Sequence, residues 1–161
     1  MDFEVSEQME TILTMVREFV DNELVPIEGE MLHGSPETVQ GLVVAAQAKV
    51  RQMGLWAPNH PEEYGGLGES LLTYALCVEE LARGWMSVSG VINTHFIVAY
   101  MLMQHGTEAQ KRKYLPRMAA GEVRGAFSMS EPGFGSDVAA VKTKATRTAE
   151  GYEITGQKMW L

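Results

Sequence analysis

The sequence predicts a mainly helical protein, with a helical bundle over residues 1–121 followed by the first strands of a β-rich unit over residues 122–161. As far as about residue 120, apolar residues recur at spacings of three and four, which is the period of an amphipathic helix. After Gly121 the pattern changes to alternation and β-branched residues become frequent, which favours strands. Helices first and strands afterwards indicate two packed units and not an interleaved α/β sheet.

The first predicted helix covers about residues 5–28, and we expect Pro26 to end or bend it. A second helix is predicted from Ser35, an N-cap serine that is followed by Pro36 at the first helical position. Gly54 is expected to close this helix, because glycine readily adopts the left-handed conformation that ends many helices.

Residues 57–68 contain two prolines and three glycines, so we expect a long ordered loop there. Two further helices are predicted over residues 70–83 and 86–105. The second of these is apolar on nearly every side, which is typical of a helix at the centre of a bundle. Thr107 and Gln110 then form the pattern of a capping box at the start of a short helix.

Three segments are predicted to form strands: residues 123–129, 138–148 and 151–161, the last with a turn at Gly156. The loop between the first two, residues 130–137, reads SEPGFGSD and differs in composition from the chain before it. It contains serines, glycines and one proline, and apolar residues do not recur in it at helical spacing. A plain connection between strands is one interpretation of such a loop.

The same loop also has the composition of a ligand site. On a strand, Phe127 and Met129 point to one face, and Ser130 places a hydroxyl at the end of that strand. Ser136 and the glycines before it offer backbone N–H groups that a ligand can approach closely. Such a surface suits a flat, partly apolar ring that has hydrogen-bonding edges and carries phosphates.

Composition excludes several classes of protein. A net charge of −8 provides no basic surface for nucleic acid or for anionic lipid. Cys77 is the only cysteine, which excludes an internal disulfide and a cysteine-based zinc site. We expect no membrane insertion, and a cytoplasmic protein, although a trimmed protein of the mitochondrial matrix would have the same composition. No histidine lies close in sequence to the loop serines, and neither a dinucleotide-binding glycine motif nor a P-loop is visible.

Five segments of the chain match landmarks of one family in order: PEEYGGLG at 61–68, CVEELAR at 77–83, HGTEAQKRKYLPRMAAGE at 105–122, AFSMSEPGFGSD at 126–137 and YEITGQKMW at 152–160. With these motifs the sequence resembles the acyl-CoA dehydrogenases over essentially its whole length. The resemblance implies an all-helical N-terminal domain, the start of a β-barrel-like middle domain, and non-covalently bound FAD.

The resemblance also implies roles for individual residues. Phe127 and Met129 would meet the flavin ring, and Ser130, in place of the more usual threonine, would hydrogen-bond its polar edge. Trp160 would cover the flavin, and Ser136 would contact the pantetheine or pyrophosphate part of the acyl-CoA substrate.

The helix over residues 86–105 corresponds to part of the acyl-chain wall in the family, where Ser89, Gly90 and Asn93 would lie. Close helix packing is an equal explanation for Gly90. No catalytic residue is expected within this chain, because the catalytic glutamate of the family would lie C-terminal to Leu161. The acids of the EELA motif, Glu79 and Glu80, match a structural landmark and not that base.

The implied activity is FAD-dependent α,β-dehydrogenation of an acyl-CoA in fatty acid or branched-chain acyl-CoA catabolism, with an electron-transfer flavoprotein or similar acceptor as partner. The complete protein is expected to be a homo-oligomer, a dimer or tetramer, and the isolated chain is expected to be inactive. An acyl-CoA oxidase or flavin-dependent monooxygenase on the same scaffold is the alternative, and so is a non-catalytic partner subunit.

Overall fold

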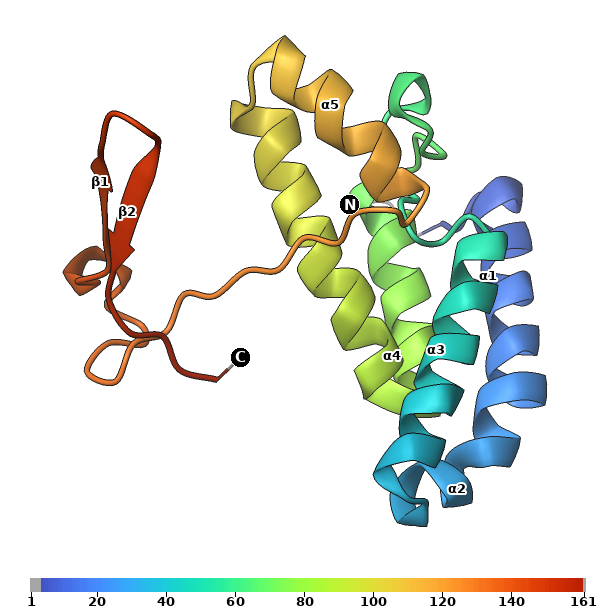
Figure 1. The fold of residues 1–161 in the computed structure, drawn as a ribbon. Coiled ribbons are helices and arrows are strands. Elements are labelled where there is room, and N and C mark those ends of the chain that lie inside the picture. The colour runs from blue at the N-terminus through green and yellow to red at the C-terminus, as the bar shows by residue number, and fades with distance from the viewer. Residues whose placement is uncertain (1–3, 161) are drawn as a thin grey trace. The chain divides into compact units, whose positions relative to one another are not determined.

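The computed structural model describes residues 4–160 and divides the chain into two compact units. We call residues up to Gly125 the helical unit and residues from Ala126 onward the hairpin unit. Figure 1 shows five labelled α-helices in the first and two strands in the second. This order of helices and then strands confirms the predicted fold class.

The first helical segment is not one continuous α-helix, so the prediction of a single helix over residues 5–28 is wrong in detail. Helix α1 covers Glu7–Phe19, after which the chain widens into a π-helical turn over Val20–Leu24. A 3₁₀ turn over Val25–Ile27 contains Pro26, and helix α2 covers Glu28–His33. Pro26 has no N–H to give to an α-helical ladder, so it marks the bend that the sequence predicted.

Helix α3, Pro36–Gln52, begins as the sequence predicts. The Ser35 hydroxyl accepts a hydrogen bond from the Thr38 N–H at 3.2 Å, which satisfies one of the free donors of the first turn. Gly54 follows the helix with a φ of +75°, in the left-handed region that glycine adopts without strain. The loop after it contains one short 3₁₀ turn, Glu62–Tyr64.

Helix α4, Leu71–His105, unites the two helices that were predicted separately. Trp85 interrupts it with extended backbone angles (φ −154°, ψ 115°), so the two predictions correspond to its two halves. Among residues 4–160 no single helix is long and apolar enough to cross a membrane, although the segments Leu71–Gly90 and Ile92–His105 meet the length and composition criteria together as a bent pair.

The second half of α4, which is apolar on nearly every side, is buried along part of its surface. Its inner side is buried and includes Val88, Ile92 and Ala99. Met86, Tyr100 and Met101 are exposed, with Met86 at 73%. Within the helical unit, α4 packs against α1, α3 and the next helix, α5.

Helix α5, Glu108–Ala119, has the predicted capping box. The Thr107 N–H donates to Gln110 Oε1 at 2.8 Å, and the Gln110 N–H donates back to Thr107 Oγ1 at 3.3 Å. Two donors at the helix start are thus satisfied by local side chains.

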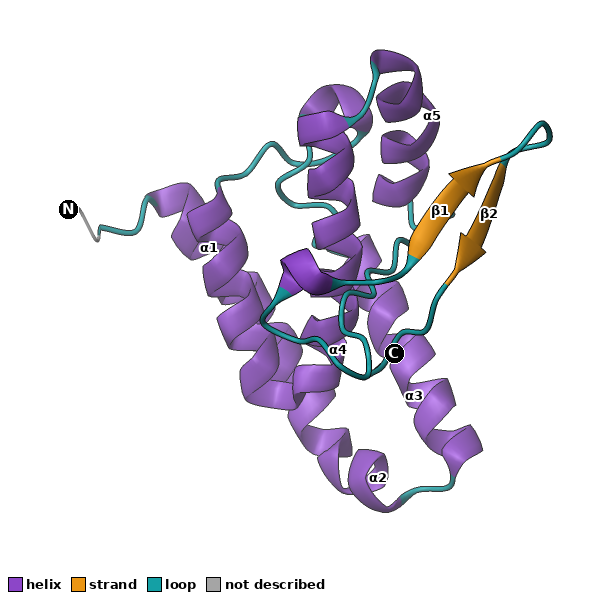
Figure 2. Ribbon diagram, turned by 90° about the vertical axis from the view of Figure 1, so that its left-hand side faces the viewer, coloured by secondary structure: helices purple, strands orange, loops and turns teal. Residues whose placement is uncertain are grey.

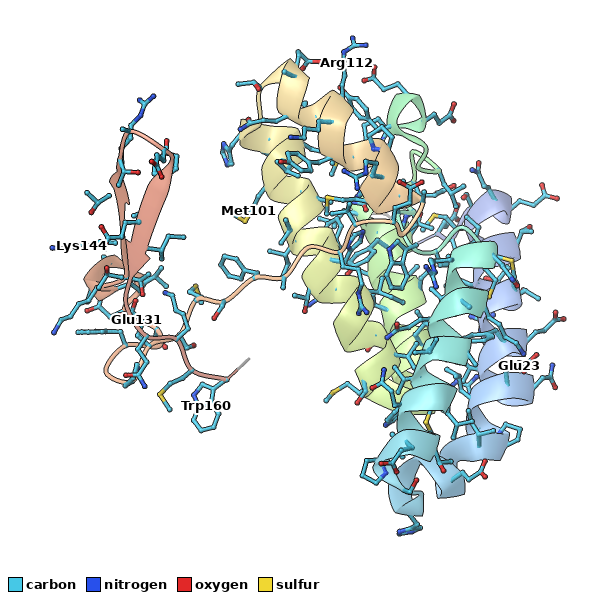
Figure 3. The ribbon with its side chains drawn as sticks, in the orientation of Figure 1. Glu23, Met101, Arg112, Glu131, Lys144 and Trp160 are labelled. Carbon is cyan, nitrogen blue, oxygen red and sulfur yellow. The ribbon has the colours of Figure 1, made fainter. Side chains whose placement is uncertain are left out.

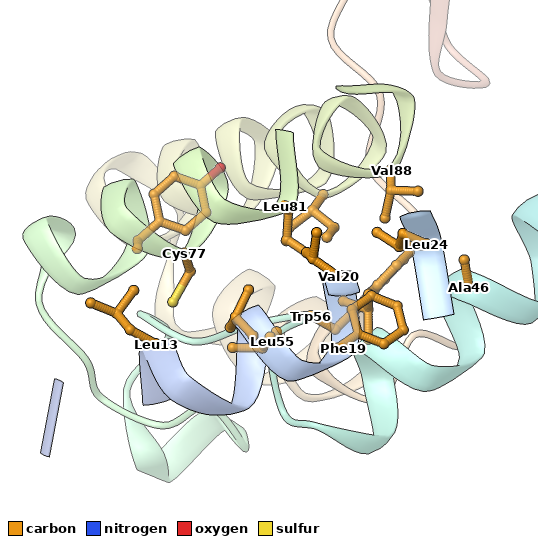
Figure 4. Packing of buried hydrophobic residues seen from close by; sticks show 14 residues of the cluster. Leu13, Phe19, Val20, Leu24, Ala46, Leu55, Trp56, Cys77, Leu81 and Val88 are labelled. Atoms are coloured by element: carbon orange, nitrogen blue, oxygen red, sulfur yellow. The ribbon is translucent and has the colours of Figure 1, made fainter. Parts of the chain in front are cut away.

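The main core of the helical unit lies between α1, α3 and α4, as Figure 4 shows. Its buried members include Leu13, Phe19, Leu55 and Leu81. At Gly84 the backbone of α4 approaches the π-helical turn so closely that an added Cβ would lie 2.9 Å from Val20 Cγ1. A side chain at position 84 would therefore separate these two elements.

The hairpin unit contains β1, Lys144–Arg147, and β2, Tyr152–Thr155, paired antiparallel with Lys144 opposite Thr155 (Figure 2). A 3₁₀ turn covers Val138–Ala140. The predicted strand over residues 123–129 is absent, and no strand forms over residues 157–160. A strand needs a hydrogen-bonded neighbour, and no described segment pairs with residues 123–129 in a ladder.

Candidate functional site

The loop over residues 130–137 is anchored by the Glu131 carboxylate, whose side chain is 5% exposed. Its Oε1 accepts hydrogen bonds from the Thr143 hydroxyl at 2.6 Å, the Thr143 N–H at 2.8 Å and Lys158 Nζ at 3.1 Å. Oε2 accepts from the Lys142 N–H at 2.7 Å. These donors, the Thr143 hydroxyl first, lower the pKa of Glu131 to about 2. Glu131 is therefore an ionised tether between three segments of the hairpin unit.

Glu131 also closes a tight turn with Phe134. The two residues exchange main-chain hydrogen bonds of 2.9 and 3.0 Å, which fold Pro132 and Gly133 into the tip of the turn. The Lys142 ammonium lies 5.1 Å from the centre of the Phe134 ring, within the range of a cation–π interaction. Beside this turn is a hollow of about 320 Å³, which the turn lines together with Gly156 and its neighbours.

The segment before the turn presents unused hydrogen-bond donors. The Met129 carbonyl accepts from Lys158 Nζ at 2.9 Å, and the Ser130 carbonyl accepts from the Met159 N–H at 2.9 Å. Within residues 4–160, the main-chain N–H groups of residues 127–130 donate to no acceptor. The Ser128 hydroxyl oxygen is buried and also has no partner among the described groups. We call the N–H groups of residues 127–130 the donor edge.

The other predicted residues of this unit are open to solvent. Phe127 and Met129 are partly exposed, at 41% and 37%. Ser136 is exposed, and only its carbonyl is used, by the Val138 N–H at 3.0 Å. Trp160 is 86% exposed, has a φ of +61°, and its side chain extends away from the loop in Figure 3.

The predicted residues of α4 do not share one face. Ser89 is buried and its hydroxyl donates to the Met86 carbonyl at 2.7 Å. Gly90 and Asn93 are exposed, and a Cβ added to Gly90 would meet nothing within 4 Å. Asn93 Oδ1 accepts a hydrogen bond from the Tyr74 hydroxyl at 3.0 Å. Burial raises the pKa of Tyr74 to about 12, so this hydroxyl keeps its proton and remains a donor.

Of the two neighbouring acids of α4, Glu79 and Glu80, the second forms ion pairs with two arginines. Glu80 accepts from Arg17 at 2.8 Å and from Arg83 at 3.1 Å, and these partners, Arg17 first, lower its pKa. A carboxylate already paired with two guanidinium groups is a weak candidate for a base.

The donor set of the hairpin unit fits a ring whose edge carries hydrogen-bond acceptors. The donor edge and the Ser130 hydroxyl supply donors, and Phe127 and Met129 supply partly exposed apolar surface. The residues therefore fit the polar edge of a flavin. Within residues 4–160, no group of three or more His, Cys, Asp or Glu side chains is placed to hold a metal ion.

Comparison with known proteins identifies the family. Residues 6–122 match the N-terminal domain of the acyl-CoA dehydrogenases. The chain therefore belongs to the acyl-CoA dehydrogenase family, which confirms the resemblance seen in its motifs.

Curated and solved relatives agree with this assignment. The chain is 34% identical to the short-chain-specific acyl-CoA dehydrogenase of Clostridium acetobutylicum, over 100% of this chain and 41% of that protein. A glutaryl-CoA dehydrogenase solved with glutaryl-CoA superposes with a TM-score of 0.82 at 30% identity, over 99% of this chain and 40% of the other. An acyl-CoA dehydrogenase of Bacillus anthracis solved with FAD has a TM-score of 0.82 at 31% identity, over 98% of this chain and 26% of the other. The chain thus spans well under half the length of these relatives.

Proposed function

We propose that the full-length protein carrying this chain is an FAD-dependent acyl-CoA dehydrogenase, which removes hydrogen from Cα and Cβ of an acyl-CoA thioester in fatty acid or branched-chain acyl-CoA catabolism. The observation that carries this proposal is the donor edge, whose main-chain N–H groups have no acceptor among the described residues and which includes the residue that carries the Ser130 hydroxyl. Relatives whose names specify acyl-CoA substrates, and one solved with FAD, support it.

In this proposal each predicted site residue of the hairpin unit has a defined role. The donor edge and Ser130 hold the polar edge of the ring, and Phe127 and Met129 contact its apolar part. Trp160 covers the ring, and Ser136 binds the pantetheine or pyrophosphate part of the substrate. When bound, FAD supplies the acceptor for the hydride from Cβ. Donors fixed before reaction stabilise negative charge on a reduced ring without reorganisation.

The helical unit would contribute to the wall beside the acyl chain. Gly90 and Asn93 lie on the exposed side of α4, and Gly90 leaves open space where a side chain would be. Ser89 would contribute to this wall only from the buried side of α4, because its hydroxyl already donates to the Met86 carbonyl. The base that removes the Cα proton would lie C-terminal to Leu161, which is outside the described residues.

Partners and location follow the family in this proposal. Electrons would leave through an electron-transfer flavoprotein or a similar acceptor, and the complete protein would be a homo-oligomer, a dimer or tetramer. The domain boundary after residue 121 and a location in the cytoplasm, or in the mitochondrial matrix of a eukaryote, stay predictions.

The test is flavin binding by the full-length protein. We expect a yellow protein whose flavin absorbance bleaches when a short or branched acyl-CoA is added. Ser130→Ala should weaken FAD binding by roughly tenfold, about the effect of one hydrogen bond to a polar ring. Thr146→Ala is the control, because Thr146 is exposed on β1 and its side chain has no described partner.

Three results would argue against the proposal in different ways. A protein that stays colourless with saturating FAD would contradict the flavin site. Flavin binding without bleaching by any acyl-CoA would favour a non-catalytic partner subunit. Bleaching followed by stoichiometric peroxide formation in air would favour an oxidase on the same scaffold.

A further inference from the structure

Lys158 connects the segment before the turn with the carboxylate that anchors the loop. Its ammonium donates to the Met129 carbonyl at 2.9 Å and to Glu131 Oε1 at 3.1 Å. The Lys158 side chain is 24% exposed and the Glu131 side chain 5%, so the pair is largely shielded from water. One side chain therefore contacts both the segment that carries the donor edge and the anchor of the loop.

The contact with Met129 also affects the donor that follows it. The Met129 carbonyl and the Ser130 N–H belong to the same peptide group. A cation hydrogen-bonded to the carbonyl polarises that group and makes its N–H a stronger donor. The Ser130 N–H has no acceptor among the described residues, so the strengthened donor is available to a ligand.

The following main-chain contact fixes the direction of the donor edge. The Ser130 carbonyl accepts from the Met159 N–H at 2.9 Å, one residue after Lys158. Two successive carbonyls, of Met129 and Ser130, are thus occupied by two successive residues of one segment. With both carbonyls held, the two peptide groups that flank the Ser130 Cα have little freedom to rotate, and the Ser130 N–H keeps one direction.

We propose that Lys158 is a positioning residue for the flavin, because its ammonium both fixes and polarises the Met129–Ser130 peptide that meets the polar edge of the ring. This inference rests on the proposed function. Lys158 acts through the peptide and does not itself touch the substrate. Glu131 has a supporting part, since its carboxylate holds the ammonium in place and balances its charge.

The requirement is for a cation that can donate more than one hydrogen bond. Arginine keeps the charge and has several donors, although in a planar arrangement. Methionine keeps the length and apolar stem of lysine and removes both hydrogen bonds. Lys158→Arg and Lys158→Met therefore separate the role of the charge from the role of packing.

The experiment uses the full-length protein as wild type, Lys158→Met, Lys158→Arg and the control Lys144→Met. Lys144 lies on β1, and its side chain points away from the hairpin in Figure 3 without a described partner. The measurements are the dissociation constant for FAD, the midpoint potential of the bound flavin, and amide hydrogen exchange of Met159 in the FAD-free protein.

For Lys158→Met we expect roughly tenfold weaker FAD binding, a more negative flavin potential, and faster exchange at Met159 even without FAD. Lys158→Arg should restore most of the affinity and potential, and Lys144→Met should behave as wild type. The potential is the decisive measurement, because a general loss of packing would weaken binding without changing the electronics of the flavin that still binds.

Two results would overturn the inference while leaving the proposed function intact. One is a Lys158→Met protein with wild-type affinity and potential. The other is weaker binding with an unchanged potential and no rescue by arginine, which would make Lys158 a packing residue only. A wild-type protein that does not bind FAD would overturn the proposed function and this inference together, whereas the exchange rate at Met159 would still report on the contacts of Lys158.

Discussion

The Glu131 carboxylate and the Thr143 hydroxyl lie 2.6 Å apart, although 12 residues separate them in the chain. This contact belongs to a set in which Glu131 also accepts from the main-chain N–H groups of Lys142 and Thr143. An ionised carboxylate that accepts several N–H and O–H groups at once is a strong local constraint. Glu131 thereby links three segments of the hairpin unit, in which no described hydrophobic side chain is buried.

Replacing Glu131 by glutamine should loosen the loop. One carboxylate oxygen becomes an NH₂ group, which would face an N–H or O–H donor and leave it without an acceptor. We expect amide hydrogen exchange at Lys142 and Thr143 to accelerate by roughly tenfold or more. Glu150→Gln is the matched control, since Glu150 is exposed in the hairpin turn. Unchanged exchange in Glu131→Gln would contradict the role of the carboxylate as anchor.

The helical unit contains a buried histidine that the site does not use. His60 is fully buried, and neither ring nitrogen has a hydrogen-bond partner among the described groups. Burial, and then the charge of nearby His95, lower the pKa of His60 from 6.5 to about 4. His95 is buried too, and its pKa is lowered mainly by burial. Both rings are therefore more stable neutral in the folded protein.

Acid should destabilise the helical unit between pH 6.5 and about 4. Over this range the unfolded chain binds a proton at His60 and the folded protein does not, so the free energy of unfolding falls as the pH falls, by about 3 kcal/mol in total. The measurement is chemical unfolding followed by circular dichroism across this range.

His60→Leu is the informative variant for this prediction. It should remove the part of the pH dependence that His60 contributes and leave the part from His95, and it should cost little at neutral pH because it also removes two unsatisfied polar atoms. Glu131 does not interfere with this measurement. Because its pKa is lowered from 4.5 to about 2, its contribution to stability is complete above pH 4.5 and is lost only as the pH falls from there toward 2. An equally steep pH dependence in His60→Leu would show that other groups cause it.

Two glycines of α4 should respond in opposite ways to alanine. At Gly84 the new Cβ would lie 2.9 Å from Val20 Cγ1, so Gly84→Ala should lower the free energy of unfolding by about 1–3 kcal/mol. At Gly90 a Cβ meets nothing within 4 Å, so Gly90→Ala should raise it by up to about 1 kcal/mol through helix propensity. Urea unfolding measures both. Equal effects would mean that packing against Val20 does not distinguish the two positions.

The Gly90 variant also tests the acyl-chain wall. If Gly90 provides room for the substrate, Gly90→Ala in the full-length enzyme should raise KM for the larger acyl-CoA substrates while the protein becomes more stable. An unchanged preference among acyl-CoA substrates would remove Gly90 from the proposed wall.

The capping box of α5 offers a local prediction. Thr107→Ala removes the acceptor for the Gln110 N–H and should lower the free energy of unfolding by about 1 kcal/mol. Thr14→Ala, at an exposed position of α1 without a described side-chain partner, is the control. Denaturant midpoints of the two variants should differ, and identical midpoints would show that the capping box adds nothing to stability.

Features that depend on neighbouring residues were predictable from the sequence. The caps at Ser35 and Thr107 and the left-handed Gly54 all form as their local patterns indicate. Local chemistry suffices for these features, because each satisfies its hydrogen bonds within a few residues.

Features that depend on distant partners were not predictable. The segment 123–129 has the composition of a strand, but pairing requires a neighbour that no described residue supplies. The anchoring role of Glu131 was missed, since no local pattern links an acid to a lysine 27 residues away. The break at Trp85 was visible only as a gap between two predicted helices, and its angle depends on packing.

The candidate roles divide in the same way. The resemblance named Phe127, Met129, Ser130, Ser136 and Trp160, and the structure places all of them in the hairpin unit. Their contacts with FAD or substrate stay predictions. On α4 the sequence grouped Ser89 with Gly90 and Asn93, whereas the structure turns Ser89 inward. Ser89 directly follows the buried Val88 and precedes the buried Ile92 by three residues, so it borders the buried side of the helix.

All eight side chains of β1 and β2 are exposed, so the hairpin itself contributes no apolar core. A two-stranded hairpin is at best marginally stable in water. A protease that cuts after basic residues, added in small amounts, should therefore cleave after Lys144 and Arg147 long before it digests the helices. The survivor would be a fragment that retains the helical unit and ends at Lys144 or Arg147, and protection of the two basic sites by a ligand would report occupancy without any measurement of colour or turnover.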